Sequence, residues 1–70
     1  MQGDELKKLG SRISEIRKHK KLTMSAVCYK VGIEPSTLGR IERGEVDPKY
    51  TTLCKIAKSF NIKISDLVNQ

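Results

Sequence analysis

Residues 23–43, TMSAVCYKVGIEPSTLGRIER, carry the pattern that decides the fold. A small residue, Cys28, stands four positions before Gly32, and apolar residues lie on either side at helical spacing. These apolar residues are Val27, Val31, Ile33, Leu38 and Ile41. Two helices that cross steeply over a turn of about three or four residues impose this spacing, because only a small side chain fits at the crossing and the turn favours glycine. An ordinary helical hairpin in a small bundle is the alternative interpretation.

Start and stop signals mark the ends of these two helices. Thr23 is a plausible N-cap, since its hydroxyl can accept a hydrogen bond from a free N–H of the first turn. Gly32 can supply the left-handed backbone that ends the helix. Pro35 suits the first position of the next helix, where a missing N–H has no effect, and Gly44 closes that helix.

The flanking sequence predicts three more helices and no strand. The first runs from about Asp4 to Lys18 and the fourth from about Lys49 to Phe60, where Asn61 can end it in the left-handed conformation. Their apolar faces consist of Leu6, Leu9, Ile13 and Ile16, and of Leu53, Ile56, Ala57 and Phe60. Ile64, Leu67 and Val68 form a short last helix. Residues 1–70 are therefore expected to form one all-α domain of five helices, without repeats or flexible linkers.

The composition of the 70 residues is that of a basic globular domain. Hydrophobic residues make up 37% and charged residues 31%, and the formal net charge is +6. The sequence pI is about 9.6. Such a domain attracts polyanions, because each neutralised phosphate releases condensed counterions. A surface charge that merely keeps the protein soluble is the alternative, and composition alone does not choose between the two.

The chemistry-bearing residues do not suggest a metal site, a cofactor or a catalytic centre. Cys28 and Cys54 lack a CxxC spacing, and His19 is the one histidine, so no zinc set is formed and the thiols suit a reducing cytoplasm. No Ser/His/Asp or Cys/His set is apparent, so an enzyme is not expected. No apolar run is long enough for a membrane span or a signal peptide, and no small-molecule ligand is evident.

Three segments, IRKHKKLT, VGIEPSTLGRIERG and TLCKIAKSFNI, start at Ile16, Val31 and Thr52. In these segments the sequence resembles a known family, the phage repressor and Cro-like helix-turn-helix proteins, also called the xenobiotic-response-element family. The resemblance covers about Leu9 to Val68. It implies a lambda-repressor-like five-helix fold with the helix-turn-helix at 23–43. The third helix would enter the major groove of double-stranded DNA, and the second would lie across the phosphate backbone.

Carried over by position, the resemblance divides the site residues into two groups. Those implied to contact bases are Pro35, Ser36, Thr37 and Arg40, and those implied to contact phosphates are Thr23, Met24, Ser25, Lys30, Arg43 and Lys49. Ser36 and Thr37 can donate or accept at base edges, and Arg40 can reach guanine or a phosphate. Gly39 is expected to let the backbone approach DNA, with simple tolerance of glycine as the alternative.

The resemblance also implies an ion pair between Arg17 and Glu42 that holds the third helix against the first. Three positions depart from the family pattern. Met24 replaces a frequent glutamine and cannot make its amide contact, while Pro35 offers a base only an apolar contact. Glu34 stands at a frequent Ser or Thr cap position, where its carboxylate could cap the helix but would repel phosphate.

These observations predict a small transcription regulator that binds a two-fold DNA site as a homodimer, in a bacterial or phage-type cytoplasm. The expected dimer surface consists of Ile62, Ile64, Leu67 and Val68, which alternatively just complete the core. With no sensor domain expected after Gln70, regulation would follow protein concentration, as in Cro-like or restriction-modification controller proteins. The rival hypothesis is an antitoxin-like or other protein-interaction module with weakened DNA contacts, favoured by Met24, Glu34 and Pro35.

Overall fold

The computed structural model describes residues 3–68, so the outermost residues of the predicted 1–70 domain, 1–2 and 69–70, lie outside it. Its elements are α1 (Gly3–His19), α2 (Met24–Val31), α3 (Pro35–Glu42), α4 (Tyr50–Ser59) and α5 (Ile64–Val68). Residues 3–68 contain no strand. The predicted all-α, five-helix fold is therefore confirmed, and each helix starts and ends within about one residue of its expected bounds.

The helix ends follow from the signals in the sequence. Thr23 is the N-cap of α2, and its hydroxyl oxygen accepts a hydrogen bond from the Ala26 N–H at 3.0 Å. Gly32 ends α2 with φ +83°, and its N–H bonds to the Cys28 carbonyl at 2.7 Å. Asn61 follows α4 with φ +60°. These three predictions are confirmed.

One cap differs from expectation. Glu34 is the N-cap residue of α3 by its backbone angles, but its side chain makes no capping hydrogen bond. Pro35 at the first helical position has no N–H to satisfy, which removes one of the donors that a cap would serve. The Glu34 carboxylate is therefore left exposed at the start of α3.

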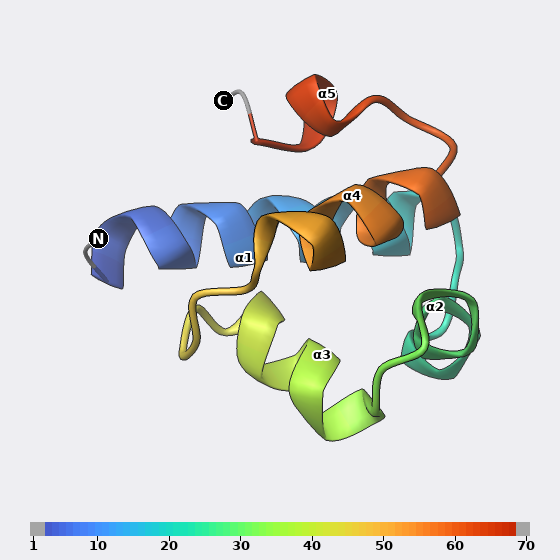
Figure 1. The fold of residues 1–70 in the computed structure, drawn as a ribbon, viewed down its shortest axis with the longest axis horizontal. Helices are drawn as coiled ribbons and strands as arrows, with labels where there is room; N and C mark the ends of the chain where they lie inside the picture. The colour runs from blue at the N-terminus through green and yellow to red at the C-terminus, as the bar shows by residue number, and fades with distance from the viewer. Residues whose placement is uncertain (1–2, 69–70) are drawn as a thin grey trace.

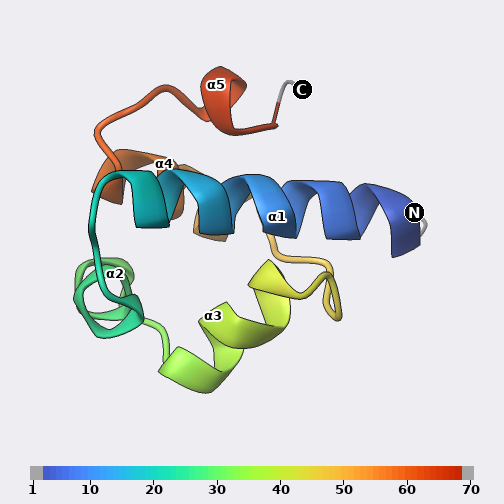
Figure 2. The same ribbon diagram turned by 180° about the vertical axis from the view of Figure 1, so that it is seen from behind.

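The helices enclose one apolar core. In Figures 1 and 2, α1 and α4 cross the middle of the molecule, with α5 above them and α2 and α3 below. Each of the five helices contributes to the core, which consists of Ile13, Val27, Cys28, Val31, Leu38, Ile41, Leu53, Ile56, Ala57, Phe60 and Leu67. Phe60, the one phenylalanine, is almost fully buried. Because α2 and α3 both pack into this core, their mutual orientation is fixed by it.

The depth at which α3 packs against α1 depends on Gly10. A Cβ atom at Gly10 would overlap the carbonyl oxygen of Ile41 and lie 2.5 Å from that of Glu42. Only glycine allows this approach of the α1 backbone to the end of α3. The sequence analysis missed this contact, although a glycine inside a helix is unfavourable by roughly 1 kcal/mol and so suggests a packing reason.

Among residues 3–68, no helix has the length and apolar character that a membrane crossing requires. Cys28 and Cys54 are both free thiols, the first buried and the second partly exposed. The same part of the chain holds no group of three or more His, Cys, Asp or Glu residues placed to bind a metal ion.

Candidate nucleic-acid interface

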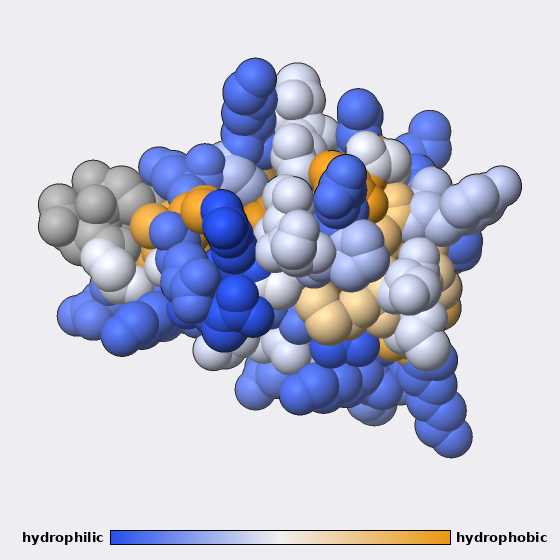
Figure 3. Space-filling view, turned by 90° about the horizontal axis from the view of Figure 1, so that it is seen from below, coloured by the Kyte–Doolittle hydropathy of each residue, from blue (hydrophilic) through white to orange (hydrophobic). Residues whose placement is uncertain are grey.

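One face of α3 is buried and the other is open to solvent. Leu38 and Ile41 point into the core, whereas the four residues implied to contact bases are all exposed. These four are Pro35, Ser36, Thr37 and Arg40. Seen from below, the molecule has hydrophilic residues around much of its outline, with weakly polar and hydrophobic residues towards its middle (Figure 3). Ser36, Thr37 and Arg40 thus present two hydroxyls and a guanidinium on the exposed side of α3.

The N-terminus of α2 provides hydroxyl groups. Thr23 and Ser25 are exposed, and the Thr23 oxygen accepts from Ala26, which leaves its own O–H free to donate. Met24 behaves differently. It is partly buried, and its terminal methyl lies 3.7 Å from the position of a Cβ at Gly39. Its side chain packs on α3, and the phosphate contact implied for Met24 stays a prediction.

A groove between α3 and the loop that follows it collects three of the predicted residues. Thr37, Arg40 and Lys49 line this groove of about 380 Å³, together with Asp47 and residues of the loop. The structure therefore brings a hydroxyl and two cations from separate elements to one place. Asp47 adds a carboxylate that sequence reasoning did not include.

Lys30 lies apart from the other implied phosphate contacts. It stands near the C-terminus of α2, about 10 Å along the helix from Thr23 at 1.5 Å per residue. It lines a separate groove together with Lys55 and Lys58 of α4. The structure thus does not bring Lys30 together with Thr23 and Ser25.

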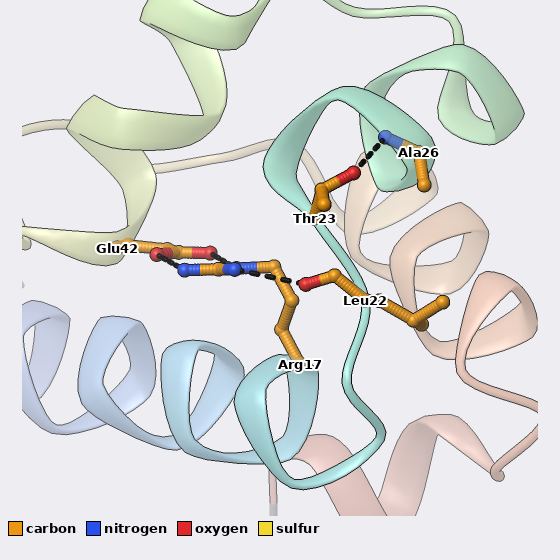
Figure 4. Close-up of polar contacts among 5 residues, drawn as sticks. All are labelled: Arg17, Leu22, Thr23, Ala26 and Glu42. Carbon is orange, nitrogen blue, oxygen red and sulfur yellow. Dashed lines mark hydrogen bonds and ion pairs between the residues drawn. The ribbon is translucent and has the colours of Figure 1, made fainter.

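Arg17 and Glu42 form the ion pair that the resemblance implies, between α1 and the end of α3 (Figure 4). Arg17 Nε donates to Glu42 Oε2 at 2.8 Å and Arg17 Nη2 to Oε1 at 3.2 Å. Arg17 Nη1 also donates to the Leu22 carbonyl at 3.0 Å. The side chains are only 11% and 9% exposed. Three guanidinium nitrogens are thus engaged inside the protein, where they fix α3 to α1 and to the turn before α2.

Arg43 also forms an ion pair, but at the surface. Its Nε donates to Glu45 Oε2 at 2.8 Å, and the side chains are 61% and 52% exposed. The hydrogen bond from Arg43 lowers the pKa of the Glu45 carboxyl, and the same bond raises the pKa of Arg43. The guanidinium lies over Gly39, where a Cβ would be 3.0 Å from Nη1. Gly39 is therefore covered by Arg43 and Met24 in this structure, and the expected close approach of its backbone to DNA stays a prediction.

Of the four residues expected to form the dimer surface, Leu67 is not available at the surface. Leu67 is completely buried in the core, so its side chain has no surface left for a partner. Val68 is 43% exposed, whereas Ile62 and Ile64 are partly buried and pack against the core. Ile62 and Ile64 also line an open groove between α4 and α5 with the partly exposed Cys54.

Sequence reasoning missed two further features. Arg12 donates from Nε and Nη2 to the Asp66 carbonyl at 3.1 and 2.8 Å, which ties α5 to α1. Tyr29 is 90% exposed on α2. Nothing local in the sequence marks the Arg12 contact, because its acceptor is a backbone carbonyl 54 positions away. Tyr29 could have been found from the helical period, which places it opposite Val27 and Val31.

The helix-turn-helix family matches residues 13–67. The immunity repressor protein of Bacillus phage phi105 is 36% identical over 62 residues, 89% of this chain, and the chain spans only 43% of that repressor. An HTH-type transcriptional regulator of Archaeoglobus fulgidus is 35% identical over 57 residues, with 81% of each chain covered. The crystal structure of the restriction-modification controller protein C.AhdI from Aeromonas hydrophila superposes with a TM-score of 0.89 at 28% identity, covering 91% of this chain and 97% of the controller. The chain therefore belongs to the helix-turn-helix family, together with a phage immunity repressor and HTH-type transcriptional regulators.

Proposed function

We propose that this protein is a small transcriptional regulator that binds double-stranded DNA at a specific sequence, with α3 in the major groove. The observation that carries the proposal is the shared exposure of Ser36, Thr37 and Arg40 on α3 and of the hydroxyl-bearing Thr23 and Ser25 at the start of α2. A helix with its side chains is about 10–12 Å wide and fits a major groove about 12 Å wide. The proposal includes a cytoplasmic location, because the DNA to be regulated lies there.

Within this proposal, the exposed residues of α3 contact bases and their neighbours contact phosphates. Ser36 and Thr37 hydrogen-bond base edges, and Arg40 donates to guanine or to a phosphate. Lys49, across the groove from Arg40, suits a phosphate, as do the hydroxyls at the start of α2. Lys30 contributes to the general attraction for DNA and not to the register, since it lies at the far end of α2.

We also propose that the protein acts as a homodimer. One recognition helix covers only a few base pairs, and a two-fold dimer places two such helices about 34 Å apart on one side of the duplex. Val68, with the partly exposed Ile62 and Ile64, is the apolar surface available for a partner on α5 and the turn before it. The controller protein C.AhdI, similar over nearly its whole length, supports a regulator of this size.

Selection of binding sites from random duplex DNA tests the proposal. We expect a palindromic consensus, and loss of that preference in Arg40→Ala. A lost bidentate base contact weakens binding by about 1–3 kcal/mol, which is roughly 5- to 150-fold. Lys8→Ala, which removes an exposed charge from α1, is the matched control and should keep the same consensus. If no sequence is enriched at low salt, specific binding is refuted.

A protein-interaction module, such as an antitoxin, is the second candidate. It is favoured by the uncapped, exposed Glu34 carboxylate at the N-terminus of α3, where it would repel a phosphate. The two candidates differ in their response to salt, because phosphate contacts make DNA affinity fall steeply as salt rises. Tight binding of a protein partner without any salt-dependent DNA binding would favour the module. Neither candidate involves catalysis.

A further inference from the structure

We propose that Glu45 is an internal competitor of DNA phosphate: it holds Arg43 against α3 and so weakens the binding of DNA. This inference rests on the proposed function, since it concerns the same face of the molecule. It changes the role expected for Arg43, which would be a phosphate contact only when released from Glu45.

The pairing is built into the turn after α3. Glu45 follows Arg43 by two positions, and the residue between them, Gly44, has φ +75°. This left-handed conformation turns the chain back, so that both guanidinium contacts reach one carboxylate, at 2.8 and 3.4 Å. A Cβ at Gly44 would also lie 2.7 Å from the Lys7 Cα, so the turn is fixed against α1. The fold therefore places the two residues close enough to pair, and both side chains are more than half exposed.

The guanidinium of Arg43 occupies the candidate DNA face. It lies over Gly39, whose missing side chain leaves room for Nη1 and Cζ, 3.0 and 3.8 Å from the site of a Cβ. Gly39 directly precedes Arg40, the expected base or phosphate contact. Arg43 thus holds its charge where a phosphate would approach, and Glu45 provides the carboxylate that already neutralises it.

The number of cations on this face makes the pairing important. Residues 35–52 contain three cations, Arg40, Arg43 and Lys49, so Glu45 engages one of the three. An exposed ion pair is weak, because solvent screens both charges. Glu45 therefore lowers the affinity for DNA moderately, by an amount that depends on the salt concentration. It does not lock the protein in a state that cannot bind DNA.

Glu45→Gln tests the inference by direct titration of one arbitrary-sequence duplex at several salt concentrations. One additional phosphate contact steepens the slope of log K against log salt by about 0.9 per bound protomer. The same relation predicts tighter binding by up to about 15-fold at 50 mM salt and about 4-fold at 200 mM. The matched control is Glu15→Gln, which removes the same charge from an exposed position on α1. Two further variants, the single Arg43→Ala and the double Arg43→Ala with Glu45→Gln, are titrated in the same way.

The expected result is a gain in Glu45→Gln that exceeds the gain in Glu15→Gln and disappears when Arg43 is replaced by Ala. Equal gains in the two glutamine variants would overturn the inference, because they would reflect net charge alone. A gain that survives Arg43→Ala would also overturn it, since Glu45 would then repel DNA by itself. If the wild-type chain shows no salt-dependent binding to any duplex, the proposed function fails and this inference fails with it.

Discussion

Replacing Arg17 by Met should unfold a large part of the molecules at elevated temperature. The substitution keeps the aliphatic stem but strands the Glu42 carboxylate, which is 9% exposed, and leaves the Leu22 carbonyl without its donor. Breaking a buried ion pair by removing one partner destabilises a protein by about 3–5 kcal/mol, whereas an exposed pair contributes about 0–1 kcal/mol. The 11% and 9% exposures put this pair with the buried ones.

The size of the domain makes that loss easy to measure. At 0.05–0.15 kcal/mol per residue, 70 residues give a total stability of about 4–10 kcal/mol. A loss of about 3 kcal/mol lowers Tm by roughly 12–24 °C in a domain of this size. Thermal and urea unfolding followed by far-ultraviolet circular dichroism would measure both quantities.

The double variant Arg17→Met with Glu42→Met provides the control. It removes both charges at once, and replacing a buried pair by apolar residues is often neutral or stabilising. We therefore expect the double variant to be more stable than Arg17→Met alone. The single variant Glu42→Met completes the cycle. A loss below about 1 kcal/mol in Arg17→Met would refute the reasoning, and so would a loss in the double variant equal to the sum of the two single-variant losses, because the two side chains would then be uncoupled.

Three other substitutions test the packing, the cap and the buried thiol. Gly10→Ala should destabilise the fold by about 1–3 kcal/mol, because the added methyl overlaps the end of α3. Gly39→Ala should be neutral or stabilise the fold by up to about 1 kcal/mol, since only the flexible end of the Arg43 side chain must shift. Urea unfolding of the two variants compares these free energies. Thr23→Ala should cost about 1 kcal/mol and Thr23→Ser much less in the same assay, because serine keeps the accepting oxygen. Burial, with a smaller effect of Glu42, raises the pKa of the Cys28 thiol above its usual 9.0. The neutral thiol therefore supports the folded state fully below about pH 9, and this support is lost at higher pH, where the unfolded chain releases the proton first. Above about pH 9, the Tm of Cys28→Ala should therefore fall less than the Tm of the wild type.

The fold was predictable because its signals are local. The helix ends are marked by signals that act within a few residues: the Thr23 cap, the left-handed Gly32 and Pro35 at the start of α3. The helical spacing of the apolar residues predicts which face of each helix is buried. Gly10 escaped prediction because its role is a contact with α3, more than thirty positions away along the chain. Periodicity also could not show that Leu67 completes the core and leaves the surface to Val68.

The candidate site was predictable only in part, because exposure follows from the helical period but side-chain pairing does not. The family resemblance implied that Ser36, Thr37 and Arg40 lie on the outer face of α3, and the structure has them exposed. The pairing of Arg43 with Glu45 depends on the conformation of the glycine between them. The position of Lys30 beside α4 depends on how α2 packs, which no local signal specifies.

The distribution of charge connects the two proposals. The net charge is +6, yet the exposed charges of the segment 34–49 balance, because Glu42 is paired with Arg17 inside the protein. The exposed acids are Glu34, Glu45 and Asp47, and the exposed bases are Arg40, Arg43 and Lys49. The positive excess therefore lies elsewhere on the chain, where it attracts DNA over a range of about one Debye length without setting register. Under the proposed function, phosphate contacts near α3 are then few, and we expect most of the binding energy there to come from base contacts. A face of this kind binds weakly to arbitrary DNA and gains most from the correct sequence, and a carboxylate that neutralises one of its three cations increases that difference.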